Sequence, residues 1–131
     1  MFRQIENKGQ IIAVVVSAQF KKEGIEFFTP SDFSQQLGYM NRPEGYVIAP
    51  HVHLEVKRQV NNTQEVLYIK SGKLKVDLYD DDKKFLESLV LQTGDIILLA
   101  SGGHGFEMLE QTEVIEVKQG PYAGEECKER F

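Results

Sequence analysis

The chain has 131 residues, of which 41% are hydrophobic and 27% are charged. This length is typical of one domain, and the composition is that of a folded globular protein rather than a disordered or fibrous one. The formal net charge of −5 argues against nucleic acid as a partner, because nucleic-acid affinity depends on a clustered basic surface.

Neither a membrane segment nor a disulfide is expected. No apolar run approaches the roughly 18 residues that cross a bilayer, and residues 1–6 lack the apolar segment of a signal peptide. The single cysteine, Cys127, lies among glutamates and has no partner in the chain for an internal disulfide. We therefore expect a cytoplasmic protein with no membrane partner and an inert surface thiol.

Strand-length runs of apolar or alternating residues recur along the chain, and turn signals rich in Gly, Asn and Asp separate most of them. In chain order these runs are Ile11–Ser17, Ile25–Phe28, Tyr46–Glu55, Glu65–Lys70, Lys73–Tyr79, Phe85–Leu91, Asp95–Leu99, Gly105–Leu109 and Val114–Lys118. Short strands at this spacing predict an all-β sandwich or barrel.

The segment between the second and third of these runs has the signals of a helix. Thr29 is a suitable N-cap, Pro30 suits the first helical position, Asp32 places a carboxylate in the first turn, and Gly38 is a C-cap candidate. These signals predict one short helix over Thr29–Leu37.

The first run, Ile11–Val16, has a composition that suggests a cover on both of its faces. Ile11–Val16 is apolar at every position, which is typical of a strand that is covered on both faces. In a barrel wall the core covers one face. Either a second subunit across a two-fold interface or the Thr29–Leu37 helix covers the other, and we expect a homodimer.

Three histidines and one glutamate are the residues that best fit a chemical role. His51 and His53 are two residues apart in a predicted strand, so both imidazoles point to the same face. Imidazoles on an inner face need a hydrogen bond or a metal. Glu65 opens the next run, and His104 follows two glycines, which allow the backbone to turn tightly beside a ligand.

The spacing of these residues resembles the two motifs of the cupin superfamily. The first motif is matched by Gly45, five residues, His51, one residue, His53, and then by Glu65, six residues and Gly72. The second is matched by Gly94-Asp95, the apolar run Ile96–Leu99, Gly102 and His104. This resemblance covers residues 45–108 and implies a cupin-type jelly-roll β-barrel whose metal ligands are His51, His53, Glu65 and His104.

The sequence departs from the cupin pattern in three ways. Eleven residues, Leu54–Gln64, separate His53 from Glu65, where cupins usually have three or four. Ala100 stands where the second motif usually has proline, and this motif is one residue shorter than usual between Gly102 and His104. Met108 stands where asparagine is common. No ligand position is lost, but the enlarged loop weakens any inference about substrate from the average family member.

The ligand set indicates the kind of metal. Three imidazoles and one carboxylate suit a divalent transition metal such as Mn, Fe, Co, Ni or Zn. Four protein ligands around an octahedral ion leave two positions open, where substrate oxygens can bind. One such metal per chain is the cofactor that we expect.

The expected function is that of an enzyme acting on a small sugar-like or anionic metabolite, because the chain resembles small single-domain cupins of sugar-nucleotide and cell-surface polysaccharide metabolism. Isomerase or epimerase chemistry is the first hypothesis and metal-dependent dioxygenase chemistry the second. The alternative is a non-catalytic module that binds a metal or a sugar. Glu107 is the candidate catalytic residue, and the candidate substrate-binding residues are Tyr39, Arg42, Lys57 and Arg58.

Overall fold

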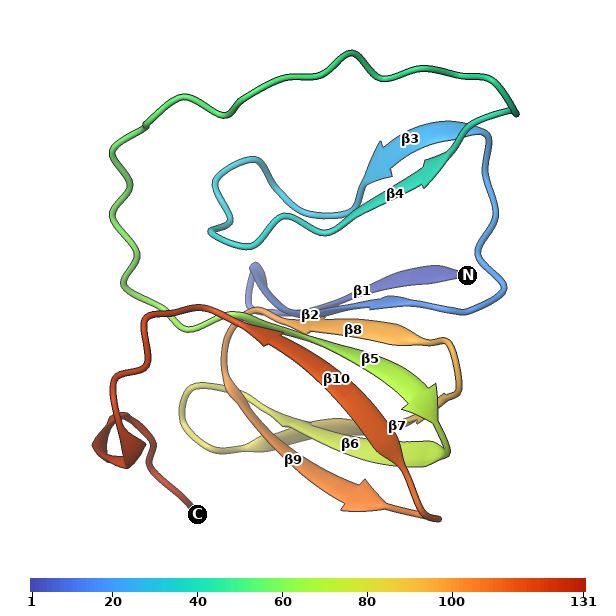
Figure 1. Cartoon of the computed structure of the whole chain (residues 1–131). Coiled ribbons are helices and arrows are strands. Elements are labelled where there is room, and N and C mark those ends of the chain that lie inside the picture. Colours follow the sequence, from blue (N-terminus) through green and yellow to red (C-terminus); the bar gives the residue numbers. More distant parts are fainter.

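The computed structural model describes residues 1–131 and contains ten strands in three antiparallel sheets (Figure 1). In spatial order the five-stranded sheet consists of β1 (Phe2–Asn7), β2 (Gln10–Val16), β8 (Ile96–Leu99), β5 (Glu65–Ser71) and β10 (Glu113–Lys118). The three-stranded sheet consists of β7 (Phe85–Gln92), β6 (Lys73–Tyr79) and β9 (Gly103–Met108). The third sheet is the hairpin of β3 (Gly24–Phe27) and β4 (Gly38–Asn41). The predicted all-β class is confirmed, but the sheets do not close into a barrel.

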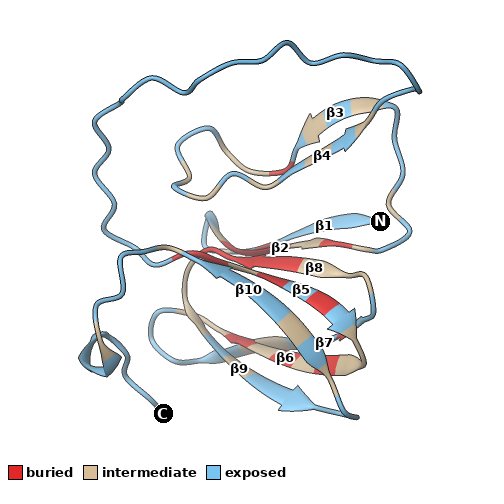
Figure 2. Ribbon diagram, viewed as in Figure 1, coloured by how far each residue is buried: buried red, intermediate tan, exposed pale blue.

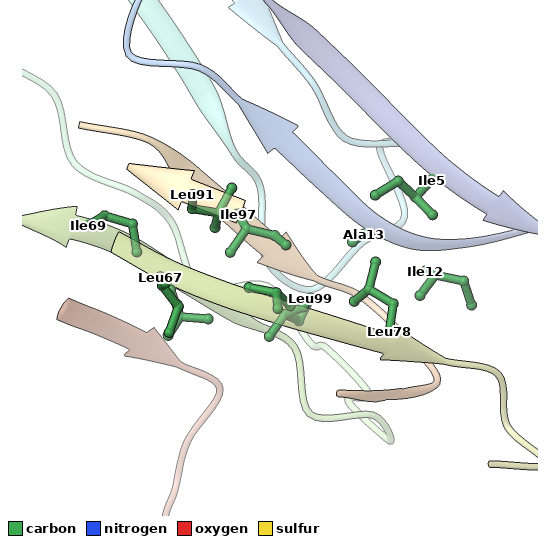
Figure 3. Close-up of a cluster of buried hydrophobic side chains, with 11 residues drawn as sticks. Ile5, Ile12, Ala13, Leu67, Ile69, Leu78, Leu91, Ile97 and Leu99 are labelled. Atoms are coloured by element: carbon green, nitrogen blue, oxygen red, sulfur yellow. The ribbon is translucent and has the colours of Figure 1, made fainter. Parts of the chain in front are cut away.

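The main hydrophobic core lies between the five-stranded and three-stranded sheets (Figure 3). Leu74, Val76 and Leu78 alternate along β6 and are fully buried. They face Leu67 and Ile97 of the five-stranded sheet in one cluster of 11 buried residues. Period-two alternation on the facing strands therefore defines the inner face of each sheet.

A second, smaller core explains why β2 is apolar on both faces. Val14 is fully buried on the side of β2 that faces away from the main core, in a cluster with Phe28 and Leu98. Phe33 and Leu37 pack against the same cluster. Of the two covers expected for this strand, the segment over residues 29–37 is the one observed in the single chain.

The prediction of a helix over Thr29–Leu37 is wrong, because this segment is the turn-rich loop of the β3–β4 hairpin. The amide of Phe28 donates to the carbonyl of Leu37, so pairing continues past both strands. Side chains then form hydrogen bonds with backbone groups that would pair with each other in a helix. Thr29 Oγ1 accepts from the Leu37 amide, and Gln36 Nε2 donates to the Pro30 and Phe33 carbonyls. Such local side-chain bonds compete with helix formation.

The prediction of a strand over Tyr46–Glu55 is also wrong. Residues 42–64 contain no helix or strand, and residues 42–63 are all exposed, as the pale blue loop in Figure 2 shows. Valine and isoleucine favour a strand only when a neighbouring edge supplies hydrogen bonds, and Pro50 removes one donor from the run. Residues 42–63 are called the arm below.

The other eight predicted strands are confirmed with small shifts at their ends, whereas β1 and β4 were not predicted. The only helical element is the 3-10 turn η1 (Glu125–Cys127), which includes the exposed Cys127. No helix here has the length and apolar character to span a membrane.

Candidate metal and ligand site

Glu65 is an acidic residue on the inner face of the five-stranded sheet. It is the first residue of β5, and the alternation of that strand places it on the same face as the buried Leu67 and Ile69. Glu65 itself is only 8% exposed. A carboxylate at such a position requires a compensating partner, because burial without one is costly.

His104 is that partner and comes from the opposite sheet. The β6–β9 register pairs His104 with the buried Leu78, so the imidazole is on the inner face of the three-stranded sheet. Its Nε2 lies 2.9 Å from Oε1 of Glu65. The turn before it needs glycine at Gly102, which has a φ of 72° and where a Cβ would lie 2.2 Å from the carbonyl oxygen of Tyr79.

The contact with His104 keeps Glu65 ionised. The hydrogen bond from His104 lowers the pKa of Glu65 to about 2, and this effect outweighs the opposing effect of burial. A hydrogen bond with Glu116 and the positive charge of Lys118 lower it further. The inner face therefore holds an anionic carboxylate next to an imidazole, which is a pair of ligand types suited to a transition metal.

Glu116 is a further residue of this site that the sequence analysis did not identify. The β10–β5 register pairs Glu116 with Leu67 and Lys118 with Glu65, so both side chains lie on the inner face. The hydrogen bond with Glu65, together with burial, raises the pKa of Glu116. The sequence gives only a weak signal for Glu116, because apolar residues occupy both faces of this strand: Val114 packs against the core, whereas Ile115 and Val117 are exposed.

His51 and His53 form a second pair, on the arm. Their ring centroids are 5.3 Å apart, and Nδ1 of His51 lies 2.9 Å from the carbonyl oxygen of Ala49. Both are exposed. Within one chain no three His, Cys, Asp or Glu side chains are grouped so as to hold a metal ion. The four predicted ligands thus lie as two separate pairs, Glu65 with His104 and His51 with His53.

The candidate substrate-binding residues are mostly on the arm. The guanidinium of Arg42 lies 4.6 Å from the centroid of the Tyr46 ring, and Lys57 and Arg58 are exposed. Tyr39 is instead half-buried in the second core, where its ring packs edge-on against Phe20. A cationic group is therefore present, but it accompanies the histidine pair on the arm and not Glu65.

The candidate catalytic residue Glu107 faces away from this site. It is next to Phe106 on β9, and the register pairs it with Lys75, whose Nζ lies 3.5 Å from its Oε1. Because His104 is three residues away on the same strand, the two side chains are on opposite faces. Glu116, rather than Glu107, is the carboxyl group adjacent to Glu65.

Comparisons with known proteins give no independent guide to this site. No protein-family model, no curated protein and no solved structure matches the chain. Only the residues themselves, and their positions on the two sheets and the arm, therefore indicate a function.

Proposed function

We propose that the chain is a metal-binding cupin in which His51, His53, Glu65 and His104 hold one divalent transition metal. The observation that carries the proposal is the 2.9 Å contact between Glu65 and His104. These two residues are 39 positions apart in sequence and belong to different sheets, yet both were selected from sequence spacing alone. Two facing antiparallel sheets are also what an incomplete jelly roll would contain.

The donor groups fit such a metal chemically. Glu65 stays ionised because of its low pKa, and a carboxylate must be ionised to bind a metal. His51 and His53 lie side by side on the arm, and imidazole with carboxylate is the ligand combination of Mn, Fe, Co, Ni and Zn sites. When bound, the metal would supply Lewis acidity to substrate oxygens.

We propose an enzyme that acts on a small sugar-like or anionic metabolite, with isomerase or epimerase chemistry first and dioxygenase chemistry second. Arg42, Lys57 and Arg58 offer charge-assisted hydrogen bonds to a phosphate or carboxylate. Glu116 offers a carboxyl group that can exchange a proton on the inner face, beside Glu65.

A non-catalytic module that binds a metal or a sugar is the second candidate, and the position of Glu107 favours it. Glu107 lies on the outer face of β9 with Lys75, so the base expected from the sequence is not beside the proposed ligands. If Glu116 serves only to hydrogen-bond Glu65, the site would bind a ligand without turning it over.

Two measurements together test these functions. Elemental analysis of purified protein should find about one transition metal per chain, and the metal-loaded protein should then be assayed against a panel of phosphosugars and nucleotide sugars. Turnover that is lost in Glu116→Gln but retained in the outer-face control Glu107→Gln supports the enzyme. Binding of a panel member without turnover supports the module, and a metal-free protein that takes up no added metal overturns both metal-dependent functions.

A further inference from the structure

The arm is an extended segment with no partner in its own chain. Its residues 43–63 make two hydrogen bonds, one from the Tyr46 amide to the Pro43 carbonyl and one between His51 and Ala49, and both are internal. Seven large apolar side chains of the arm are between 40% and 83% exposed: Tyr46, Val47, Ile48, Val52, Leu54, Val56 and Val60. A segment that exposes this many apolar side chains is typical of an interaction site.

The two sheets that face each other both end in an unpaired edge. Strand β9 pairs with β6 only, and β10 pairs with β5 only. Each edge leaves a row of backbone N–H and C=O groups available for another strand. On β9 the inner-face side chains Phe106 and Met108 are 41% and 55% exposed, so an added strand would also cover apolar surface.

Charge and residue pattern match the arm to these edges. Residues 103–118, which form β9, β10 and their connection, contain four glutamates and one lysine, whereas the arm carries Lys57, Arg58 and Arg42 against two glutamates. In the arm, the alternation from Ile48 to Val56 would place His51 and His53 on one face and Val52 and Leu54 on the other. Addition of such a segment to a free edge is a known form of recognition through backbone hydrogen bonds.

The arm does not approach its own β9. In Figure 1 it runs around the outside of the β3–β4 hairpin, whereas β9 lies beyond the five-stranded sheet. Its two ends are also anchored: Asn41 Nδ2 donates to the Lys22 carbonyl, and the buried Gln64 accepts from Ser34 and Gln35. The β9 edge that an arm in this position can meet is therefore that of another molecule.

We propose that the arm of one copy adds as a strand to edge β9 of a second copy, and that the two copies exchange arms across a two-fold axis. Such an isologous exchange buries both arms and both edges in one closed dimer. It also brings His51 and His53 of one chain to Glu65 and His104 of the other. This last consequence rests on the proposed metal function, whereas the exchange itself does not.

A disulfide test of the exchange needs no metal. Val52 on the arm and Gly105 on the outward side of β9 are the positions to join, because a Cβ at Gly105 meets no atom within 4 Å. The variant Val52→Cys/Gly105→Cys is made with Cys127→Ser, which removes the single native cysteine, and is then oxidised at low concentration. We expect a covalent dimer, with loss of the monomer band on a non-reducing gel.

The other outcomes overturn the exchange. A monomer with an internal disulfide would show that the arm docks on its own chain. If no disulfide forms within or between chains, the arm does not lie beside β9, even if light scattering gives the mass of a dimer. The matched control is Val52→Cys/Lys21→Cys, which keeps the same arm cysteine but moves the second cysteine to the exposed Lys21 position. We expect the control to remain uncrosslinked.

Complementation then tests the shared metal site. His51→Ala/His53→Ala and His104→Ala should each lose metal, and the two variants are unfolded and refolded together in equal amounts. Half of the dimers should then be mixed, each with one intact site, so the mixture should regain about a quarter of the parent's metal content. If the parent protein binds metal but the refolded mixture regains none, the shared site is overturned. A parent without metal overturns the proposed function but leaves the disulfide result valid.

Discussion

Oε1 of Glu65 lies 2.9 Å from Nε2 of His104, although the two residues belong to strands of different sheets. The contact crosses the gap between the first residue of β5 and the second residue of β9. It joins the two facing sheets at a carboxylate that also shares a hydrogen bond with Glu116.

Metal binding should depend on the four proposed ligands. Single replacement of His51, His53 or His104 by Ala should abolish stoichiometric metal, and binding should weaken in mild acid, because a histidine ligand must be neutral and protons compete with the metal for its nitrogen. Elemental analysis after gel filtration measures this. Glu107→Ala, on the outer face of the same strand as His104, should keep its metal. A triple His→Ala variant with full metal content would contradict the assignment.

The stability supplied by Glu65 should depend on pH in a defined direction. The pKa of Glu65 is lowered to about 2 in the folded chain from an ordinary 4.5, so its contribution is fully present above pH 4.5 and is lost as the pH falls towards 2. Glu65→Gln should lower the free energy of unfolding of the metal-free protein by about 1–3 kcal/mol at pH 7, the scale of a hydrogen bond to a charged group. Urea titrations at several pH values should show that difference shrinking below pH 4.5.

Glu116→Gln should show the opposite trend. The hydrogen bond with Glu65 raises the pKa of Glu116, so protonated Glu116 stabilises the fold below its unfolded pKa, and this contribution is lost as the pH rises through the folded value. Glutamine keeps a hydrogen-bond donor towards Glu65 but does not ionise. Relative to the parent, the metal-free variant should gain stability between pH 4 and pH 8 in urea titrations. A constant difference across that range would rule out the shared hydrogen bond.

The cations of the arm should affect ligand binding and not metal content. If they hold an anionic ligand, Arg42→Ala or Arg58→Ala should weaken binding by ~1–3 kcal/mol, the value of a lost charge-assisted hydrogen bond. A thermal-shift screen of phosphosugars with metal present measures the change. Lys21→Ala, an exposed lysine outside the arm, should stay within ~0.5 kcal/mol of the parent. If all three variants bind the ligand equally well, the arm cations are ordinary solvent-exposed charges with no role in binding.

Two glycines with similar backbones should differ in how well they tolerate alanine. Gly9 and Gly72 have φ values of 77° and 98°, but a Cβ at Gly9 meets nothing within 4 Å, whereas one at Gly72 lies 2.4 Å from the Gln111 carbonyl oxygen. Gly9→Ala should cost about 1–2 kcal/mol for the left-handed backbone alone. Gly72→Ala should cost a further ~1–3 kcal/mol for the clash, as compared by urea unfolding. Equal losses would show that the β5–β6 turn rearranges freely.

Local residue patterns were sufficient to predict the all-β class and most of the strands. Alternation along β5 and β6 is a local property that each strand carries with it, because side chains two apart must share a face. The cupin-like spacing predicted Glu65 and His104 as ligands of one site, and the two side chains lie 2.9 Å apart in the fold. The apolar run Ile11–Val16 predicted a strand covered on both faces, and Val14 is indeed buried beneath the β3–β4 hairpin.

Which segments pair with another strand depended on contacts between distant parts of the chain. Tyr46–Glu55 has the composition of a strand but meets no edge in its own chain, and residues 29–37 have helix signals but are held as a loop by the hairpin that they join. Glu116 entered the site through register, since its neighbour Leu67 is set by β-ladder pairing and not by sequence distance. Hydrogen bonds between distant strands and the burial of Glu65 against His104 are non-local interactions, and local residue patterns do not specify them.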